Sequence, residues 1–366
     1  MKATKLATFL AAAAVTAFGA LHAAQQPTVD EQVLLERINR ARLHQADEQK
    51  RLGIDFQTGM TQAVQADLPP LIWSAGLQSA SVAHDADMWA NGYYGHVNST
   101  GQAPFAQVQD VDSSFFAVGQ NLGAGRQYAT ADAVYSGWMV DAGEIGCGHR
   151  ANMLYPTLNA FGAAVSSKYG SYYGTYWTAD FGVTTATTPY VTGVIFRDLN
   201  ANGQYDAAEG QAHWKVRLIA QSPDESAQDA GSSANAGNSA DAPAWTDAYD
   251  TGGYALPVAA AGDYTVEAMA PDGTIYDATV GVDSENVKVD FELNHATPEG
   301  AATQPGAASG SPVAATVPSS LNAVAVSSSG QKSGCELNCG SSNGWNLLAM
   351  MGVLFAALIG LRIRNC

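Results

Sequence analysis

Apolar residues recur at helical spacing in the first half of the chain. Between residues 29 and 49 they repeat with a period near 3.6, which predicts an amphipathic helix with Asp30 as its N-cap. Residues 75–91 repeat the pattern and stop at Gly92, a residue type that readily adopts the left-handed conformation common at helix ends. Shorter helices are expected further along, at residues 103–108 and 129–140.

Strand patterns follow these helices. Residues 160–167 and 172–183 are aromatic, β-branched and interrupted by glycine, so they predict a hairpin. Helices beside a small sheet indicate an α+β first domain. Only strand patterns follow residue 190, which predicts an all-β second domain. Its strands are expected at residues 191–196, 214–220, 252–258, 262–268 and 287–293.

The first 24 residues predict an export signal. Lys2 and Lys5 precede an alanine-rich apolar run, and small residues follow near the expected cleavage point. A buried helix is the alternative, and the position at the start of the chain argues against it. Export would place the rest of the chain outside the cytoplasm. The sequence contains only four cysteines, so we expect no disulfide scaffold.

The C-terminal end predicts a tether to the cell envelope or cell surface. Residues 344–366 hold an apolar run of about the length that crosses a bilayer, ended by Arg362 and Arg364. Cytoplasmic arginines would leave the body of the protein outside. The segment also resembles the C-terminal sorting tails of exported bacterial proteins, which are cut and replaced, and both interpretations stay open. Residues 222–244 predict a disordered loop, and residues 296–343 predict a flexible stalk.

The net charge excludes one class of partner. Asp and Glu outnumber Lys and Arg by 34 to 17, which gives a formal net charge of −17. A surface of this sign repels phosphate groups and attracts cations. Nucleic acid is therefore not an expected partner, and the membrane is expected only through the C-terminal segment.

Two histidines lie in segments dense with glycine and aromatic residues. His96 follows Gly92-Tyr93-Tyr94-Gly95, and His149 lies within Gly148-His149-Arg150-Ala151-Asn152-Met153-Leu154; each adjacent glycine is expected to clear space around the imidazole. With Gly119-Gln120-Asn121-Leu122 and Tyr176-Trp177-Thr178-Ala179-Asp180-Phe181-Gly182, these motifs resemble the CAP superfamily of cysteine-rich secretory, antigen 5 and pathogenesis-related proteins, especially its bacterial secreted branch. The resemblance covers about residues 29–184 of a domain expected at 29–188. It implies an αβα sandwich, but this family is functionally diverse, so it implies little about activity.

The resemblance implies a cleft lined by two histidines and two acids. His96 and His149 match the histidines, whereas Gln120 occupies the position of the first acid and cannot ionise. Asp141 or Glu144 would supply the second acid. Two imidazoles and a carboxylate could hold zinc and activate a water molecule, which would make these residues catalytic. The alternative is a structural role or weak metal binding, and the loss of the first acid favours it.

Four further residues of the first domain are expected to be structural. Arg150 and Asn152 complete the motif around His149, and we expect them to brace the loop and cap the following segment rather than touch a substrate. Trp138 and Trp177 are expected to lie in the core.

Residues 198–209 have the spacing of a twelve-residue calcium loop. Oxygen-bearing side chains occupy the first, third, fifth, ninth and twelfth places, glycine occupies the sixth, and the seventh would supply its backbone carbonyl. A strand rather than a helix enters the loop, so it is not part of an EF-hand. The alternative is a glycine turn with polar residues. The predicted calcium ligands are Asp198, Asn200, Asn202, Gln204, Asp206 and Glu209.

The second domain, at residues 190–294, resembles the B-type immunoglobulin-like repeats of bacterial adhesins and the related prealbumin-like domains. The resemblance implies a β-sandwich spacer that calcium stiffens.

Two functions are considered for the whole chain. In the first, a surface-tethered, non-enzymatic CAP protein binds a small lipid, glycan or protein ligand in its cleft. In the second, a metal-dependent, peptidase-like hydrolase uses His96, His149 and Asp141 or Glu144. Gln120 favours the first.

Overall fold

The computed structural model describes residues 26–141, 148–167, 173–184, 188–221 and 243–294, together with the backbone of residues 336–339. The chain divides into two compact units. Among the described residues, unit 1 comprises those from 37 to 184 and 336–339, and unit 2 comprises 26–36 and those from 188 to 294. The predicted export signal, the membrane or sorting segment and most of the predicted stalk and disordered loop lie outside the described residues.

Local capping signals set the ends of helix α4. Helix α4 begins after Ser74, whose hydroxyl accepts the backbone N–H of Leu77, and ends at Gly92 with φ 66°. The single helix predicted between residues 29 and 49 is two helices, because the chain leaves helical geometry at His44. The helices of the described residues, in chain order, are α2 (Val29–Leu43), whose first part up to Glu36 belongs to unit 2, α3 (Gln45–Leu52), α4 (Ala75–Asn91), α5 (Pro104–Val111), the 3-10 turn η1 (Arg126–Tyr128), α6 (Ala131–Val140) and α7 (His149–Met153).

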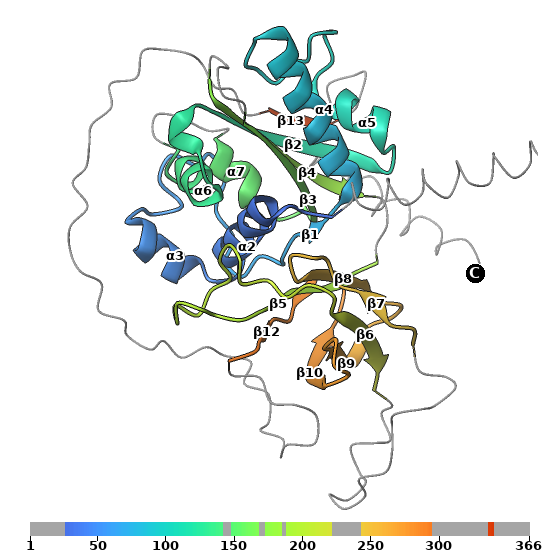
Figure 1. The fold of residues 1–366 in the computed structure, drawn as a ribbon. Helices are drawn as coiled ribbons and strands as arrows, with labels where there is room; N and C mark the ends of the chain where they lie inside the picture. The colour runs from blue at the N-terminus through green and yellow to red at the C-terminus, as the bar shows by residue number, and fades with distance from the viewer. Residues whose placement is uncertain are drawn as a thin grey trace, which may run out of the picture. The chain divides into compact units, whose positions relative to one another are not determined.

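One mixed sheet forms the middle of unit 1 (Figure 1). Its strand order is β1-β3-β4-β2-β13, and only the pairing of β1 with β3 is parallel. The predicted hairpin is β3 and β4, and β2 beside it was not predicted from the sequence. The strands are β1 (Ile72–Trp73), β2 (Phe115–Ala124), β3 (Ala160–Ser167), β4 (Thr175–Thr184) and β13 (Glu336–Cys339).

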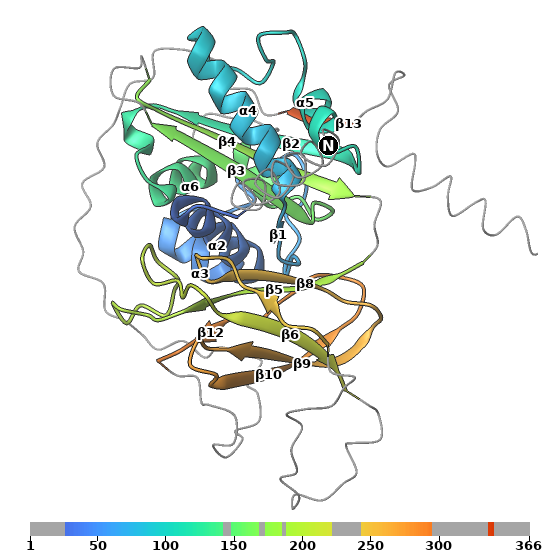
Figure 2. The same ribbon diagram turned by 45° about the vertical axis from the view of Figure 1, so that its right-hand side comes forward.

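Helices pack on both faces of this sheet, as Figure 2 shows for α4 and α6. On one face, a Cβ atom added to Gly162 of β3 would lie 2.2 Å from the backbone nitrogen of Gln78 in α4. On the other, a Cβ added to Gly123 of β2 would lie 2.8 Å from Val134 of α6. The layering predicted for the first domain is therefore present. Trp138 and Trp177 are 2% and 0% exposed, so their predicted core positions are confirmed.

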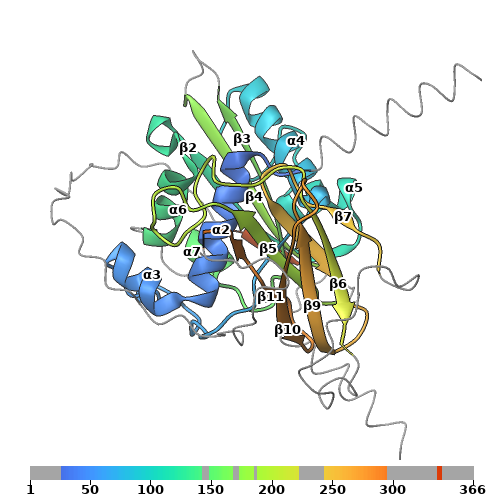
Figure 3. The same cartoon turned by 60° about the horizontal axis from the view of Figure 1, so that its bottom comes forward.

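Unit 2 is rich in β-structure. One sheet has the order β10-β9-β6-β7, and the other contains β11, β5 and β12, with β8 paired to β5; Figure 3 shows β6, β9 and β10 side by side. Strand β10 was not predicted. The strands are β5 (Tyr190–Phe196), β6 (Lys215–Ala220), β7 (Thr246–Asp247), β8 (Gly253–Pro257), β9 (Gly262–Met269), β10 (Ile275–Val282), β11 (Val287–Lys288) and β12 (Phe291–Glu292).

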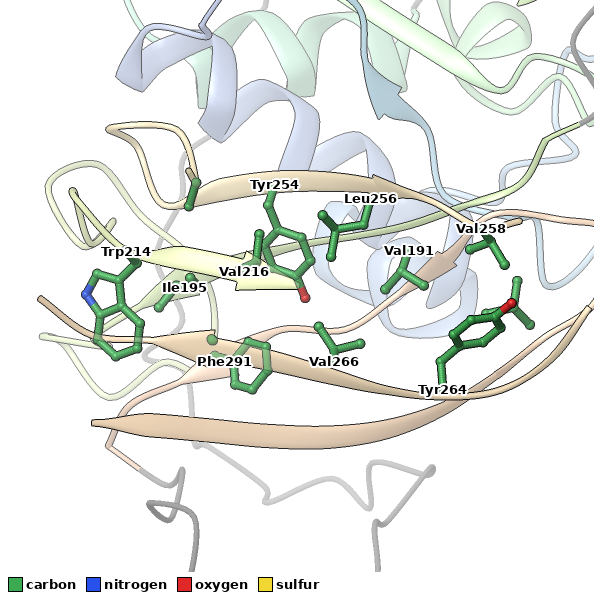
Figure 4. Close-up of a cluster of buried hydrophobic side chains, with 13 residues drawn as sticks. Val191, Ile195, Trp214, Val216, Tyr254, Leu256, Val258, Tyr264, Val266 and Phe291 are labelled. Carbon is green, nitrogen blue, oxygen red and sulfur yellow. The ribbon is translucent and has the colours of Figure 1, made fainter. Parts of the chain in front are cut away.

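The core of unit 2 draws side chains from both sheets (Figure 4). Val191 and Leu256 come from β5 and β8, and Val216 and Val266 come from β6 and β9. Burial of such apolar surface is the main stabilising contribution to a domain of this size. The assignment to an immunoglobulin-like fold stays a prediction. Of the helices within the described ranges, none combines the length and the hydrophobicity that a membrane span requires.

Candidate functional site

His149 lies at the start of α7, in contact with the end of α6. Its Nδ1 is 2.9 Å from Asp141 Oδ1, and its ring stacks on Trp138 with 6.0 Å between ring centroids. Because an ionised carboxylate only accepts hydrogen bonds, Nδ1 carries the proton in this pair. The Nε2 atom is buried and has no hydrogen-bond partner among the described residues. We call His149, Asp141 and Trp138 the His149 centre.

Local backbone geometry places the carboxylate of Asp141. This residue ends α6 in the left-handed conformation, with φ 48°, which Asp tolerates better than most residues. A Cβ atom added to Gly148 would lie only 1.7 Å from Asp141 Oδ2. The glycine before His149 therefore makes room for the carboxylate, and not for the imidazole as the sequence had suggested. Gly95, before His96, has open space at the same position.

Arg150 and Asn152 fix the segment that carries His149. Arg150 donates hydrogen bonds to the carbonyls of Met139, Val140, Phe56 and Thr58, at 2.6–3.0 Å. Burial lowers the pKa of Arg150, and the nearby Asp141 carboxylate opposes this change. Asn152 donates to the carbonyl of Gln120 at 3.1 Å and therefore ties α7 to β2. The bracing part of the role predicted for both residues is confirmed, and the capping part stays a prediction.

His96 lies in the loop after α4 and is held by a different set of groups. Its Nδ1 is 2.9 Å from Gln120 Oε1, and Gln120 Nε2 donates to Asp180 Oδ1 at 3.1 Å. Ser81 on α4 lies 2.8 Å from the other oxygen of Asp180. Burial raises the pKa of Asp180 to about 7, although hydrogen bonds from Ser81 and Gln120 lower it. We call His96, Gln120, Asp180 and Ser81 the His96 centre.

A third histidine lies beside the His96 centre. His84 of α4 is 2% exposed, and its Nε2 is 3.0 Å from the carbonyl of Gly95. A carbonyl only accepts, so Nε2 carries the proton and Nδ1, also buried, has no hydrogen-bond partner among the described residues. Burial, with a smaller contribution from His96, lowers the pKa of His84 to about 4, although the hydrogen bond to Gly95 opposes this change.

Sequence reasoning missed Asp180 and its role. Its only sequence signal is that it is the single charged residue in the strand Thr175–Thr184. A carboxyl group in such a strand is buried unless the strand lies at a surface, and a buried carboxyl needs polar partners. Those partners come from α4 and β2, so they could not be identified from spacing along the chain.

Each of the two centres is hydrogen-bonded to strand β2, through the neighbouring residues Gln120 and Asn121. Side chains of successive strand residues point to opposite faces. The side chain of Gln120 contacts His96, whereas that of Asn121 donates to the carbonyl of His149 at 3.0 Å. Within the described residues, no three His, Cys, Asp or Glu side chains form a group that could hold a metal ion. Zinc binding by His96 and His149 stays a prediction, and Glu144 lies outside the described residues.

In the predicted calcium loop of unit 2, the side chain of the first residue accepts hydrogen bonds from the backbone of the residues that follow it. The oxygens of Asp198 accept the backbone N–H groups of Asn200 and Asn202 at 3.3 and 3.2 Å and that of Gly203 at 2.7 Å. Burial raises the pKa of Asp198, but these backbone donors outweigh burial and hold the pKa below its usual value. Gly203 has φ 71°, which explains the glycine at the sixth place.

The last residues of this loop converge on the same region. Asn200 and Asn202 both donate to Asp206 Oδ2, at 2.8 and 2.7 Å. The oxygens of Glu209 accept the backbone N–H groups of Leu199 and Asp206 at 2.9 and 2.8 Å, and Glu209 is 2% exposed. The side-chain amides of the third and fifth places thus meet the carboxylate of the ninth, while the carboxylates of the first and twelfth hold the loop backbone. Oxygen donors of this kind suit calcium.

Comparison with known proteins identifies the first domain. Residues 35–181 match the family model of CAP, the cysteine-rich secretory protein family. No curated protein matches the chain. A solved structure of an outer surface protein from Borrelia burgdorferi is 15% identical, with a TM-score of 0.31 over 42% of this chain and 92% of its own.

A second solved structure, an extracellular protein containing a SCP domain from Bacillus anthracis, is 21% identical, with a TM-score of 0.29 over 42% of this chain and 41% of its own. Neither similarity is high enough to support a conclusion about activity. The family match, together with helices on both faces of the sheet and the histidine motifs on α7 and after α4, assigns residues 35–181 to the CAP domains.

Proposed function

We propose that this chain is an exported, surface-tethered CAP-domain protein that binds a small ligand or a protein partner through its two histidine centres, one around His96 and one around His149. One observation carries the proposal: Asp141 holds Nδ1 of His149, while Nε2 is buried without a hydrogen-bond partner among the described residues. A buried polar atom of this kind costs free energy unless something pairs with it. A bound lipid, glycan or protein group would supply that pair.

Binding without turnover is supported by the chemistry of Gln120. This residue contacts His96 where a carboxylate would act as a base, and an amide cannot take up a proton. The carboxyl group of Asp180 lies behind it, and its two oxygens are engaged by Gln120 and Ser81. The His96 centre is therefore suited to holding a ligand.

Native mass spectrometry tests the binding proposal. The full chain and its variants His149→Ala and His44→Ala would be expressed with the predicted export signal, purified in the same way and compared. His44 is an exposed histidine that makes no side-chain capping bond, so it is the matched control. The wild type and His44→Ala should carry a bound species that His149→Ala has lost. A wild-type chain that carries nothing would contradict the proposal.

Metal-assisted hydrolysis is the second candidate function. The 2.9 Å contact between Asp141 and His149 Nδ1 favours it, because carboxylates often orient metal-binding histidines in this way. Calorimetric titration with zinc tests this candidate. Zinc should bind the wild type and His44→Ala equally, and at least tenfold more weakly in Asp141→Asn. Equal affinity in all three proteins would remove this candidate.

For unit 2 we infer that residues 198–209 bind calcium and stiffen a spacer domain. The hydrogen bonds that join Asp198, Asn200, Asn202 and Asp206 within one short loop support the inference. The matched pair for the test is Asp198→Asn and Asp277→Asn, since Asp277 lies on β10 away from the loop. Calcium should raise the melting temperature of the wild type and Asp277→Asn only. A chelator that changes no melting temperature would contradict calcium binding.

The tether is supported by sequence alone. The apolar run within residues 344–366 and the predicted export signal at residues 1–24 flank the folded units. Membrane fractionation of the full chain and of a chain ending at residue 343 tests the tether. The truncated chain should leave the membrane fraction, and its retention there would argue against a C-terminal anchor.

A further inference from the structure

We propose that Asp180 is a positioning residue that, through Gln120, keeps the proton of neutral His96 on Nδ1 and its lone pair on Nε2. The inference rests on the proposed role of His96 in ligand binding, and it specifies which ligand groups the residue can accept. It follows from the register of the sheet, from the hydrogen-bonding capacity of each group and from the burial of the carboxyl.

The sheet places Asp180 directly between two uncharged residues. In the strand register, Asp180 of β4 lies opposite Gln120 of β2 and Gly162 of β3. The missing side chain at Gly162 lets the backbone of α4 come within 2.2 Å of where a Cβ would be. Helix α4 therefore closes over the carboxyl, which explains why Asp180 is 1% exposed. Its hydrogen bonds must come from protein groups.

Asp180 determines which way the amide of Gln120 points. The oxygen Asp180 Oδ1 accepts a hydrogen bond at 3.1 Å, so the nitrogen end of the amide must face it. The oxygen end of the same amide then faces His96 Nδ1 at 2.9 Å. An amide oxygen cannot donate, so Nδ1 must carry a proton. When His96 is neutral, its lone pair is therefore on Nε2.

Ser81 preserves this arrangement in both charge states of Asp180. Its hydroxyl oxygen lies 2.8 Å from Asp180 Oδ2 and 3.3 Å from the carbonyl of Gly162. When Asp180 is ionised, Ser81 donates to Oδ2. When Oδ2 is protonated, Asp180 donates to Ser81, and Ser81 donates to Gly162. In both states Oδ1 still accepts from Gln120, so titration of Asp180 does not turn the amide.

The charged and titratable neighbours of Asp180 come from few elements. Helix α4 carries two further buried titratable groups, His84 and Asp85. The loop after α4 carries His96, which lies close enough to His84 to affect the pKa of His84. Asp85 is 0% exposed and accepts a hydrogen bond from Thr178 at 2.6 Å. Asp85, on α4, is therefore a second buried carboxyl whose hydrogen bond comes from Thr178, whereas those of Asp180 come from Gln120 and Ser81.

The fixed tautomer has a consequence for the ligand. A neutral imidazole with its lone pair on Nε2 accepts a hydrogen bond from an N–H or O–H group, or it binds a metal ion. It repels a carbonyl or carboxylate oxygen placed at the same position. The His96 centre should therefore select ligands that present a donor group, such as a hydroxyl or an amide N–H.

Nitrogen NMR of the full chain, labelled with 15N-histidine and held at a pH where His96 is neutral, tests the proposal. The wild type should show His96 with Nδ1 protonated. In Asp180→Ala and in Gln120→Met, which breaks the link while leaving Asp180 in place, this single tautomer should be lost. Asp180→Asn should keep it, because an amide oxygen can still accept from Gln120, and the control Asp85→Asn should keep it as well.

Two results would overturn the proposal. One is a wild-type His96 with its proton on Nε2; the other is an unchanged tautomer in both Asp180→Ala and Gln120→Met. Either result is distinct from failure of the proposed function, which would appear as a wild-type chain that carries no ligand. The tautomer measurement uses no ligand, so the two failures can be told apart.

Discussion

In both histidine centres a side-chain oxygen contacts the Nδ1 atom of the imidazole, but the group that supplies this oxygen differs. At the His149 centre a carboxylate contacts the imidazole directly, and a glycine leaves room for it. At the His96 centre a neutral glutamine makes the contact, and the carboxyl group lies one residue deeper. The first arrangement can stabilise a positive charge on the ring at close range. The second fixes the ring nitrogens and places less charge beside them.

This difference also has a structural origin. Trp138, Asp141 and His149 lie within a dozen residues, at the junction of α6 and α7. The His96 centre instead collects residues from α4, from the loop after it, from β2 and from β4. The His149 centre therefore depends on local turn geometry, whereas the His96 centre depends on the packing of α4 against the sheet. Mutations should separate these two dependences.

The largest expected effect is the pH dependence that Asp180 gives to stability. The pKa of Asp180 is about 7 in the folded state and near 3.8 in an unfolded chain, so the folded state holds the proton more tightly. Stability from this group is complete below pH 3.8 and is lost as the pH rises through 7. Between pH 4 and pH 9 the wild type should lose roughly 4 kcal/mol relative to Asp180→Asn.

Urea unfolding at several pH values measures this difference. Asp47→Asn, at an exposed helical position, is the control and should follow the wild type. Parallel stability curves for the wild type and Asp180→Asn would show that the carboxyl is not held in its neutral form.

His84 should give a pH dependence of opposite sign. Its pKa is about 4 in the folded state and near 6.5 when unfolded, so the unfolded chain binds the proton more tightly. The wild type should lose roughly 3 kcal/mol as the pH falls from 7 to 4. His84→Gln, which can still donate to Gly95, should lack this loss, whereas the exposed His44→Gln should retain it. A loss of equal size in His84→Gln would contradict the burial of a neutral ring.

A smaller effect on the free energy of unfolding should distinguish Gly148, before His149, from Gly95, before His96. Gly148→Ala places a methyl group against the carboxylate of Asp141, and we expect a loss of about 1–3 kcal/mol in unfolding free energy. Gly95→Ala meets open space, so its effect should stay within about 0.5 kcal/mol. Denaturant unfolding of the two variants side by side measures the contrast. Equal losses would mean that the contact between Asp141 and His149 does not depend on Gly148.

The sequence predicted those parts of the fold that local signals determine. Helix α4 has the predicted bounds because Ser74 and Gly92 cap it. Strand β2 escaped prediction because nine of its ten residues are at least partly buried, so hydrophobic and polar positions do not alternate along it. His96 and His149 were thus identified by their motifs, whereas the strand that carries Gln120 was not predicted.

The predicted calcium loop and the contacts of Asp180 also differ in how far apart their residues lie along the chain. The predicted calcium loop lies within twelve consecutive residues, so its spacing alone could indicate a ligand set. Asp180 and Ser81 are 99 residues apart, and Asp180 and Gln120 are 60 apart. Only the packed sheet brings them together, and no local pattern in the sequence encodes that contact.

The central claim is that the Nε2 atoms of His149 and His96 are the groups that meet a ligand. Nitrogen NMR of the 15N-histidine-labelled full chain during a zinc titration tests it directly, because zinc reports which nitrogens can take a ligand. The account predicts that the Nε2 signals of His149 and His96 shift, while those of His84, whose Nε2 is bonded to Gly95, stay in place. Saturation with zinc that shifts only exposed histidines such as His44 would contradict it.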